Sequence, residues 1–256
     1  MRIYETNKKD LLTKVPAVML SFWIIKILCT TVGETFADYL NVTLGFGLNG
    51  TTLIMSIILM VALAFQFKSL KYTPSIYWLN VVLISVFGTL LTDNLIDNIG
   101  ISLISTTIVF SIILACVFAI WYKSEKTLSV HSITTTKRES FYWLTILFTF
   151  ALGTASGDLL AEKFAFGYII SAGIFFSVIA SVYILHSKFK LNSILAFWIA
   201  YIFTRPLGAS VGDYLSQTQD KGGLGLGTTY TSIVFLVMVM GIIFYLTKTK
   251  ADEISM

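Results

Sequence analysis

The chain has 256 residues, of which 56% are hydrophobic and 12% are charged, and its formal net charge is +4. A soluble globular chain carries about 25% charged residues, so most of this chain is expected to lie in lipid. The modest net charge gives no reason to expect nucleic-acid binding. Its two cysteines, Cys29 and Cys116, stand far apart in apolar runs, which argues against a disulfide framework.

Eight segments are apolar enough to cross a bilayer, since a transmembrane helix needs roughly 20 mostly apolar residues. We expect them at residues 17–40, 48–67, 75–96, 100–122, 140–162, 166–187, 192–215 and 225–247. The first follows a basic stretch, and its apolar run is longer than a signal-peptide core, so we interpret it as a retained helix. The predicted fold is an all-α integral membrane protein with eight transmembrane helices.

Lys and Arg residues fall mainly on one side of these segments. Fourteen of them, among them Arg2, Lys8 and Lys9, precede odd-numbered segments or follow even-numbered ones, whereas Lys163 and Lys221 lie in the opposite loops. Because basic residues collect on the cytoplasmic side of a membrane, both termini are predicted to be cytoplasmic.

The odd-numbered segments share a pattern: an aromatic residue and a Trp, a Gly ten residues later, and an Asp five residues after the Gly. The members are Trp23, Trp78, Trp143 and Trp198; Gly33, Gly88, Gly153 and Gly208; and Asp38, Asp93, Asp158 and Asp213. Four occurrences in one order predict a fourfold tandem repeat of a two-helix unit. We expect the Trp to anchor the chain at the inner membrane interface. The Gly are expected to allow close helix packing or, alternatively, local helix breaks.

The spacing of the repeats predicts two halves. Corresponding residues are 55, 65 and 55 positions apart, so extra residues separate the second repeat from the third. We predict pseudo-symmetric halves at residues 1–124 and 139–256, joined by a cytoplasmic linker at residues 125–138. Every repeat begins on the same side, so the repeats should be parallel and related by an axis along the membrane normal.

This pattern resembles a family of uncharacterised bacterial membrane proteins built from four tandem repeats of unknown function, each with two transmembrane segments and a Trp. The resemblance covers nearly the whole chain, and it rests on Trp23, Trp78, Trp143 and Trp198. It implies this architecture and a place in the bacterial cytoplasmic membrane, but it implies no activity. Function must therefore be inferred from the residues themselves.

Seven acidic residues are predicted to lie in the outer half of the membrane. Because a helix rises 1.5 Å per residue, each repeat Asp lies about 22 Å beyond its Trp, and the four share one depth. Three repeats carry a second acid one turn away on the same helix face: Glu34, Asp97 and Glu162. Thr89 and Thr154 extend that face, and Gln217 replaces the second acid in repeat four.

A charge near the bilayer centre costs at least about 2.5–3.5 kcal/mol, so these acids must face water, bind cations, pair with bases or hold protons. Crowded carboxylates favour proton binding, and hard oxygen ligands suit Mg, Ca or Mn ions better than soft metals. We therefore predict a cation site for a transported metal rather than a resident cofactor. Its ligands would be Asp38, Asp93, Asp158, Asp213, Glu34, Asp97 and Glu162. Asp97 and Glu162 have the alternative of being solvated at the outer rim.

Two basic residues lie inside predicted helices. Arg205 breaks the fourfold pattern, since Thr30, Ser85 and Phe150 hold the equivalent places. It precedes the Asp of its own repeat by eight residues, about 12 Å along the axis. We expect it to reach an acid of a neighbouring repeat, either as a gate or coupling charge or as a structural ion pair. Lys26 is expected to extend its ammonium to the inner interface.

These features predict a transporter for cations, with a divalent metal of the Mn or Mg class favoured and proton-coupled efflux as one form of it. A proton-coupled transporter of organic cations or other small solutes is the main alternative, since 14% of the residues are aromatic. We do not expect an enzyme, because no nucleophile or zinc motif is present, although an intramembrane enzyme is kept as a weaker alternative. A structural or signalling membrane protein is a further alternative, and the oligomeric state stays open.

Overall fold

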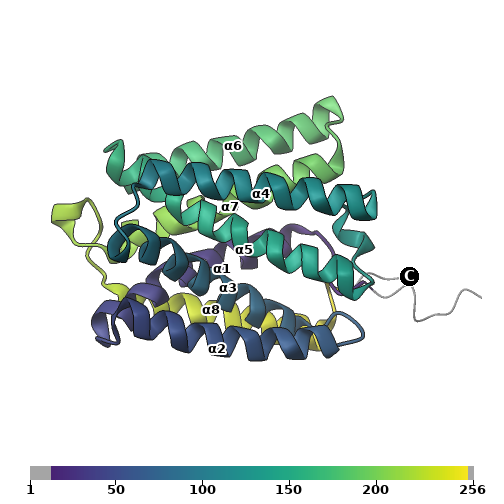
Figure 1. The fold of residues 1–256 in the computed structure, drawn as a ribbon, viewed down its shortest axis with the longest axis horizontal. Helices are drawn as coiled ribbons and strands as arrows, with labels where there is room; N and C mark the ends of the chain where they lie inside the picture. Colours follow the sequence, from purple (N-terminus) through teal and green to yellow (C-terminus); the bar gives the residue numbers. More distant parts are fainter. Residues whose placement is uncertain (1–12, 253–256) are drawn as a thin grey trace, which may run out of the picture.

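The computed structural model describes residues 13–252, which form eight long helices and no strand (Figure 1). The helices are α1 Leu20–Asp38, α2 Gly47–Lys68, α3 Pro74–Asp93, α4 Leu103–Glu125, α5 Thr136–Asp158, α6 Tyr168–Phe189, α7 Ser193–Ser216 and α8 Thr228–Thr249. All eight are long and apolar enough to cross a membrane. The predicted all-α fold with eight spans is therefore confirmed, and each predicted span overlaps its helix.

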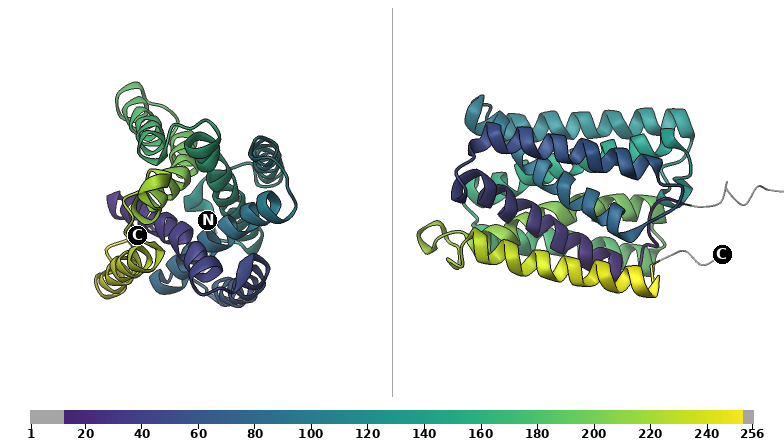
Figure 2. Two further views of the ribbon diagram at one scale, coloured as in Figure 1. Left: turned by 90° about the vertical axis from the view of Figure 1, so that its left-hand side faces the viewer. Right: turned by 90° about the horizontal axis from the view of Figure 1, so that it is seen from below.

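Both ends of the described chain lie at one end of the bundle, called here the terminal end (Figures 1 and 2). The amide of Ala17 donates to the carbonyl of Asp252 at 2.9 Å. Tyr72, in the loop between α2 and α3, also donates to the carboxylate of Asp252. Burial raises the pKa of Tyr72, so its hydroxyl stays protonated and keeps this bond. The two chain ends and the α2–α3 loop are thus tied together.

Basic residues collect at this terminal end. Those in the last turns of the four even-numbered helices are Lys68, Lys123, Lys188 and Lys248. Lys163 and Lys221 lie at the other end of the bundle. Arg2, Lys8 and Lys9, which contribute to the predicted orientation, lie outside the described residues.

The first helices of the four repeats form an inner layer. Helices α1, α3, α5 and α7 pack in a closed ring, in which α1 contacts both α3 and α7. The second helices lie outside, with α2 on α3, α4 on α5, α6 on α7, and α8 on α1 (Figure 2). Each second helix thus covers the first helix of the next repeat. The most apolar stretch of each inner helix is 56–72% buried, against 22% in each outer helix, whose remaining surface is left for lipid.

The repeat glycines lie where neighbouring inner helices touch. Each faces the residue that stands three places before the glycine of the next repeat: Gly33 faces Ser85, Gly88 faces Phe150, Gly153 faces Arg205, and Gly208 faces Thr30. A Cβ added to Gly33 would lie 1.8 Å from the Ser85 hydroxyl oxygen and 2.5 Å from the Ser85 Cβ. No side chain fits in that space, so the glycines allow the inner ring to close.

The aromatic-Trp pairs form a second ring, nearer the terminal end. Its contacts are Phe22 with Trp78, Tyr77 with Trp143, Tyr142 with Trp198, and Phe197 with Trp23. Trp78, Trp143 and Trp198 are only 1%, 4% and 4% exposed. The expectation that the Trp anchor the chain at the lipid interface is therefore wrong for these three, whereas Trp23 is partly exposed. Because the repeats are parallel, each Trp lies at the same height as an aromatic side chain of a neighbouring repeat. The Trp therefore join neighbouring repeats inside the bundle.

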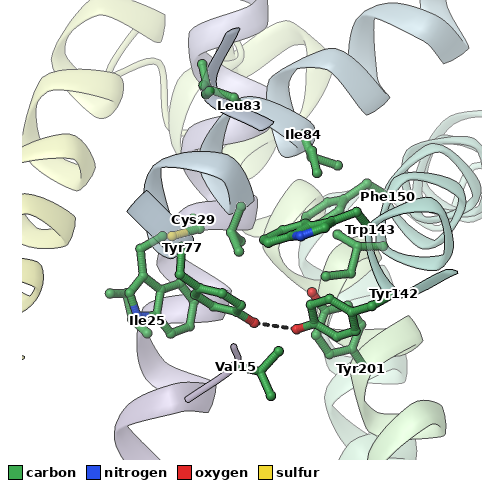
Figure 3. Packing of buried hydrophobic residues seen from close by; sticks show 14 of the residues in the cluster. Val15, Ile25, Cys29, Tyr77, Leu83, Ile84, Tyr142, Trp143, Phe150 and Tyr201 are labelled. Carbon is green, nitrogen blue, oxygen red and sulfur yellow. Dashed lines mark hydrogen bonds between the residues drawn. The ribbon is translucent and has the colours of Figure 1, made fainter. Parts of the chain in front are cut away.

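Tyr77 and Tyr142 of this ring, together with Tyr201 and Val15, fill the bundle axis (Figure 3). The hydroxyls of Tyr77 and Tyr142 are hydrogen-bonded to each other. These two and Tyr201 are at most 1% exposed, and Val15 is 3% exposed. We call Tyr77, Tyr142 and Tyr201 the tyrosine layer, and it packs the centre of the bundle at the terminal end.

The segment before α1 joins the predicted linker to this core. The Lys14 ammonium lies 2.6 Å from a carboxylate oxygen of Glu139, and the Lys14 amide donates to the carbonyl of Ile133 at 3.0 Å. Ile133 belongs to the predicted linker at residues 125–138 and is fully buried. This segment is thus part of the packed terminal end and joins the predicted linker to α5.

Replacing Gly33 by Ala should lower the melting temperature in detergent, because the new Cβ would overlap Ser85 and overpacking costs about 1–3 kcal/mol. Gly241 provides a matched control, since it lies inside α8 with nothing within 4 Å of its Cβ position. Gly241→Ala should melt at the wild-type temperature or slightly above it, since Ala favours helix. Equal melting of the two variants would contradict the closed ring.

Candidate functional site

The inner helices surround a cavity of about 380 Å³ at the end of the bundle opposite the terminal end, where α1, α3 and α5 end. Its wall includes all seven acids singled out from the sequence: Glu34, Asp38, Asp93, Asp97, Asp158, Glu162 and Asp213. Glu34 and Asp213 are 6% and 7% exposed, whereas Asp97 and Glu162 are exposed at the rim. Residues more than 170 positions apart in the chain therefore share one cavity, which we call the acidic cavity.

The backbone changes pitch directly after three of the four repeat Asp. Asp38, Asp93 and Asp158 end their α-helices, and a π-helical turn follows each one: Tyr39–Thr43, Asn94–Asn98 and Leu159–Lys163. The π turns hold the rim acids Asp97 and Glu162. Such turns are rare and occur often at functional sites. The pattern of apolar residues does not distinguish a π turn from an α turn, so the sequence analysis missed them.

The fourth repeat is built differently. Helix α7 continues past Asp213 to Ser216 and no π turn follows, but a loop returns to the cavity. Gln217 in that loop donates from its amide nitrogen to a carboxylate oxygen of Asp38 at 3.4 Å. Lys221, which the sequence analysis did not place in the site, also lines the wall. Lys221 stands in a Gly-rich insertion of repeat four, DKGGLGLG at residues 220–227, and this insertion is the signal from which its place could have been predicted.

Arg205 lies beneath the acidic cavity and is fully buried. One guanidinium nitrogen lies 2.8 Å from a carboxylate oxygen of Glu34 and donates to the hydroxyls of Thr89 and Thr154. The other terminal nitrogen donates to the carbonyl of Thr30 at 3.1 Å. These partners lie on α1, α3 and α5, so one side chain of α7 joins all four repeats. Arg205 thus reaches an acid of another repeat, as predicted.

Lys26 lies deeper in the bundle, and the expectation that it extends to the interface is wrong. It is 1% exposed, and its ammonium donates to the carbonyl of Tyr201 at 3.1 Å and to the hydroxyl of Thr204 at 2.5 Å. The nitrogen also lies 3.8 Å from the centre of the Tyr201 ring. Because α1 packs this face against α7, the side chain finds polar and aromatic partners without leaving the bundle.

The acidic cavity is an open space rather than a closed coordination cage. Within residues 13–252, no group of three or more His, Cys, Asp or Glu side chains is arranged to hold a metal ion. At about 30 Å³ per water molecule, the space has room for roughly a dozen waters. Such an arrangement can hold a cation that keeps part of its hydration shell, as Mg²⁺ usually does.

The fold and this cavity define a class of protein: a helical membrane protein of four parallel two-helix repeats, whose acids gather at one end of the inner ring. Four consecutive stretches, residues 21–72, 76–127, 141–191 and 196–252, match the family model described as Repeat of Unknown Function (DUF347). The chain belongs to this family, and the resemblance inferred from the Trp pattern is confirmed. A search of the curated proteins and a search of the solved structures each gave no match.

The pair of Arg205 and Glu34 should be strongly coupled in stability. Removing one member leaves the other charge buried without its partner, which costs about 3–5 kcal/mol. Arg205→Met and Glu34→Met should each lower the melting temperature, and the double variant should lose less than the sum of the two.

The matched control is the surface pair of Lys137 and Glu125, in which the Lys137 side chain is 64% exposed. Lys137→Met should change the melting temperature little, because exposed pairs contribute about 0–1 kcal/mol. Strictly additive losses for Arg205→Met and Glu34→Met would contradict the coupling.

Proposed function

We propose that this protein is a transporter that carries cations across the membrane and binds them in the acidic cavity. The observation that supports this proposal is that seven carboxylates from four helices line one cavity. All seven lie within segments long and apolar enough to span a membrane. Carboxylates at such depths are costly unless they meet water or positive charge, and two nearby bases, Arg205 and Lys221, do not balance seven acids.

The orientation that we propose places the terminal end in the cytoplasm of a bacterium, because Lys and Arg collect there. The acidic cavity then faces the outside, and the tyrosine layer separates it from the cytoplasm. This corresponds to an outward-open form. Transport by alternating access requires a second form, in which the inner helices separate at the tyrosine layer and close around the acids.

The substrate that we favour is a divalent metal ion of the Mg or Mn class, bound with part of its hydration shell. Carboxylate oxygens suit these hard cations, and the cavity leaves room for water around the ion. Organic cations are commonly recognised by aromatic rings. The residues that line the cavity include Val42, Ile96 and Leu103 but no aromatic side chain, which disfavours the organic-cation alternative.

Exchange against protons completes the proposal. Seven crowded carboxylates repel one another, so positive charge must replace a metal ion that leaves them. Protons are available on both sides of a membrane and fulfil this need. Proton-driven efflux of the metal is the direction that we propose.

Replacing Asp93 and Asp158 together by Asn should abolish metal flux into proteoliposomes loaded with a metal-sensitive dye. The amides keep the size of the carboxylates but remove two charges on adjacent inner helices. Glu125→Gln is the control, since Glu125 ends α4 at the terminal end, outside the cavity. Wild-type flux in the double Asn variant would refute the proposed binding site.

Thermal stability should distinguish the two substrate classes. A ligand that binds only the folded state stabilises it by about 2.7 kcal/mol at a hundred times its dissociation constant. Mg²⁺ or Mn²⁺ should therefore raise the melting temperature of the wild type but not that of the Asp93→Asn, Asp158→Asn variant. Stabilisation by tetraalkylammonium ions instead would favour the organic-cation alternative.

A further inference from the structure

Lys26 is a buried base that the acidic cavity does not include. It lies eight residues before Glu34 on α1, so it stands about 12 Å further along the helix axis, towards the terminal end. Its ammonium forms no ion pair within residues 13–252. Its two hydrogen-bond partners are neutral groups, the Tyr201 carbonyl and the Thr204 hydroxyl.

Lys26 and Arg205 both approach the ring of Phe150. The Lys26 nitrogen lies 5.1 Å and the Arg205 guanidinium carbon 5.7 Å from the centre of that ring. Two positive side chains therefore stand close together in the middle of the bundle, and only Arg205 has a carboxylate partner, Glu34. Lys26 is the less compensated of the two charges.

The remaining ionisable groups near Lys26 do not supply a negative charge. On α7 it faces Tyr201 and Arg205, and on its own helix it faces Cys29. Tyr77 of α3 and Tyr142 of α5 lie in the tyrosine layer with Tyr201. The ionisable residues of α8, which also packs on α1, are exposed on the outside of the bundle: Tyr230, Tyr245 and Lys248.

The hydrogen bonds of Lys26 suit two protonation states. In the charged state, the ammonium donates to the Thr204 hydroxyl, which in turn donates to the Tyr201 carbonyl at 2.8 Å. In the neutral state, the same hydroxyl can rotate and donate to the amine lone pair, because a threonine hydroxyl both donates and accepts. The amine still donates to the Tyr201 carbonyl. Neither state leaves Thr204 without a partner.

We infer that Lys26 is the site that carries the exchanged proton, separate from the acidic cavity and coupled to it through Arg205. This inference rests on the proposed function. When a metal cation enters the cavity from one side of the membrane, its charge adds to that of Arg205, and the ammonium gives its proton to water on that side and becomes a neutral amine. When the metal departs to the other side, the amine takes up one proton from the water there. Metal binding and protonation of Lys26 thus exclude each other, which is the requirement for exchange.

The test uses purified full-length protein in proteoliposomes, with one dye for Mg²⁺ or Mn²⁺ and one for pH. In the wild type, downhill metal movement should drive protons the opposite way, and an imposed pH gradient should drive metal uphill. Lys26→Met should keep metal-dependent thermal stabilisation and downhill metal flux but lose metal-driven proton movement to the background of empty liposomes. This variant should fold, because Met has a similar volume to Lys and the Thr204 hydroxyl still donates to the Tyr201 carbonyl at 2.8 Å.

Two further variants separate a proton site from a structural role. Lys26→Arg keeps a positive charge that a guanidinium does not release, so it should also lose proton movement. Thr204→Val removes one of two acceptors of the ammonium and should shift the pH profile of exchange to lower pH. Lys68→Met, at the end of α2 and away from the axis, is the control and should exchange like the wild type.

The outcomes distinguish the two proposals. Wild-type proton movement in Lys26→Met or Lys26→Arg, or an unchanged pH profile in Thr204→Val, overturns the role of Lys26 alone. Metal flux in the wild type without any proton movement does the same. A wild type that neither binds nor carries metal overturns the proposed function and the role of Lys26 with it.

Discussion

The close approach of the four inner helices is the constraint on which the rest of this structure depends. It is possible because each inner helix lacks a Cβ at the point where the next helix crosses it, as at Gly33 against Ser85. A ring of this width brings the four repeat Asp to one cavity and lets a single side chain, Arg205, reach three other helices. Wider spacing would separate the acids and leave Arg205 without its partners. The same ring also allows aromatic side chains to seal the terminal end.

The symmetry of the ring is broken in its centre, where the chemistry lies. At the position of Glu34, the next two repeats have Thr89 and Thr154, so one carboxylate and two hydroxyls surround one guanidinium. One level lower, Phe150 takes the place equivalent to Arg205, and both Lys26 and Arg205 lie near its ring. Fourfold repetition supplies the scaffold and the layer of acids. The residues that differ between repeats at these inner levels make the two ends of the bundle axis unlike. Negative charge lines the acidic cavity, and the positive charges of Arg205 and Lys26 lie between that cavity and the terminal end.

Sequence reasoning recovered the features that depend on period and depth. Hydropathy located all eight helices, and the constant spacing from Trp to Asp placed seven acids together because parallel repeats put equal positions at equal heights. Sequence reasoning failed where the burial of a residue depends on the direction in which its side chain points. Trp78 and Lys26 resemble residues that seek the membrane surface, yet a neighbouring helix covers both. Which face of α1 meets α7 follows from ring closure between distant repeats, and no local pattern encodes it. The π turns were missed because one extra residue in a turn leaves the apolar pattern unchanged.

The cyclic order of helices, in which α1 depends on α7 and α8, also has a consequence for synthesis. Helix α1 has the lowest mean hydropathy of the eight, 1.3, and carries both Lys26 and Glu34. Its partners on α7 lie more than 170 residues later in the chain. A ribosome therefore completes six further helices before Glu34 meets Arg205 and Lys26 meets its hydrogen-bond partners. Until then, the insertion machinery or the helices α2 to α6 must shield the polar side chains of α1 from lipid. The first helix to be made is therefore among the last to reach its final packing in the membrane.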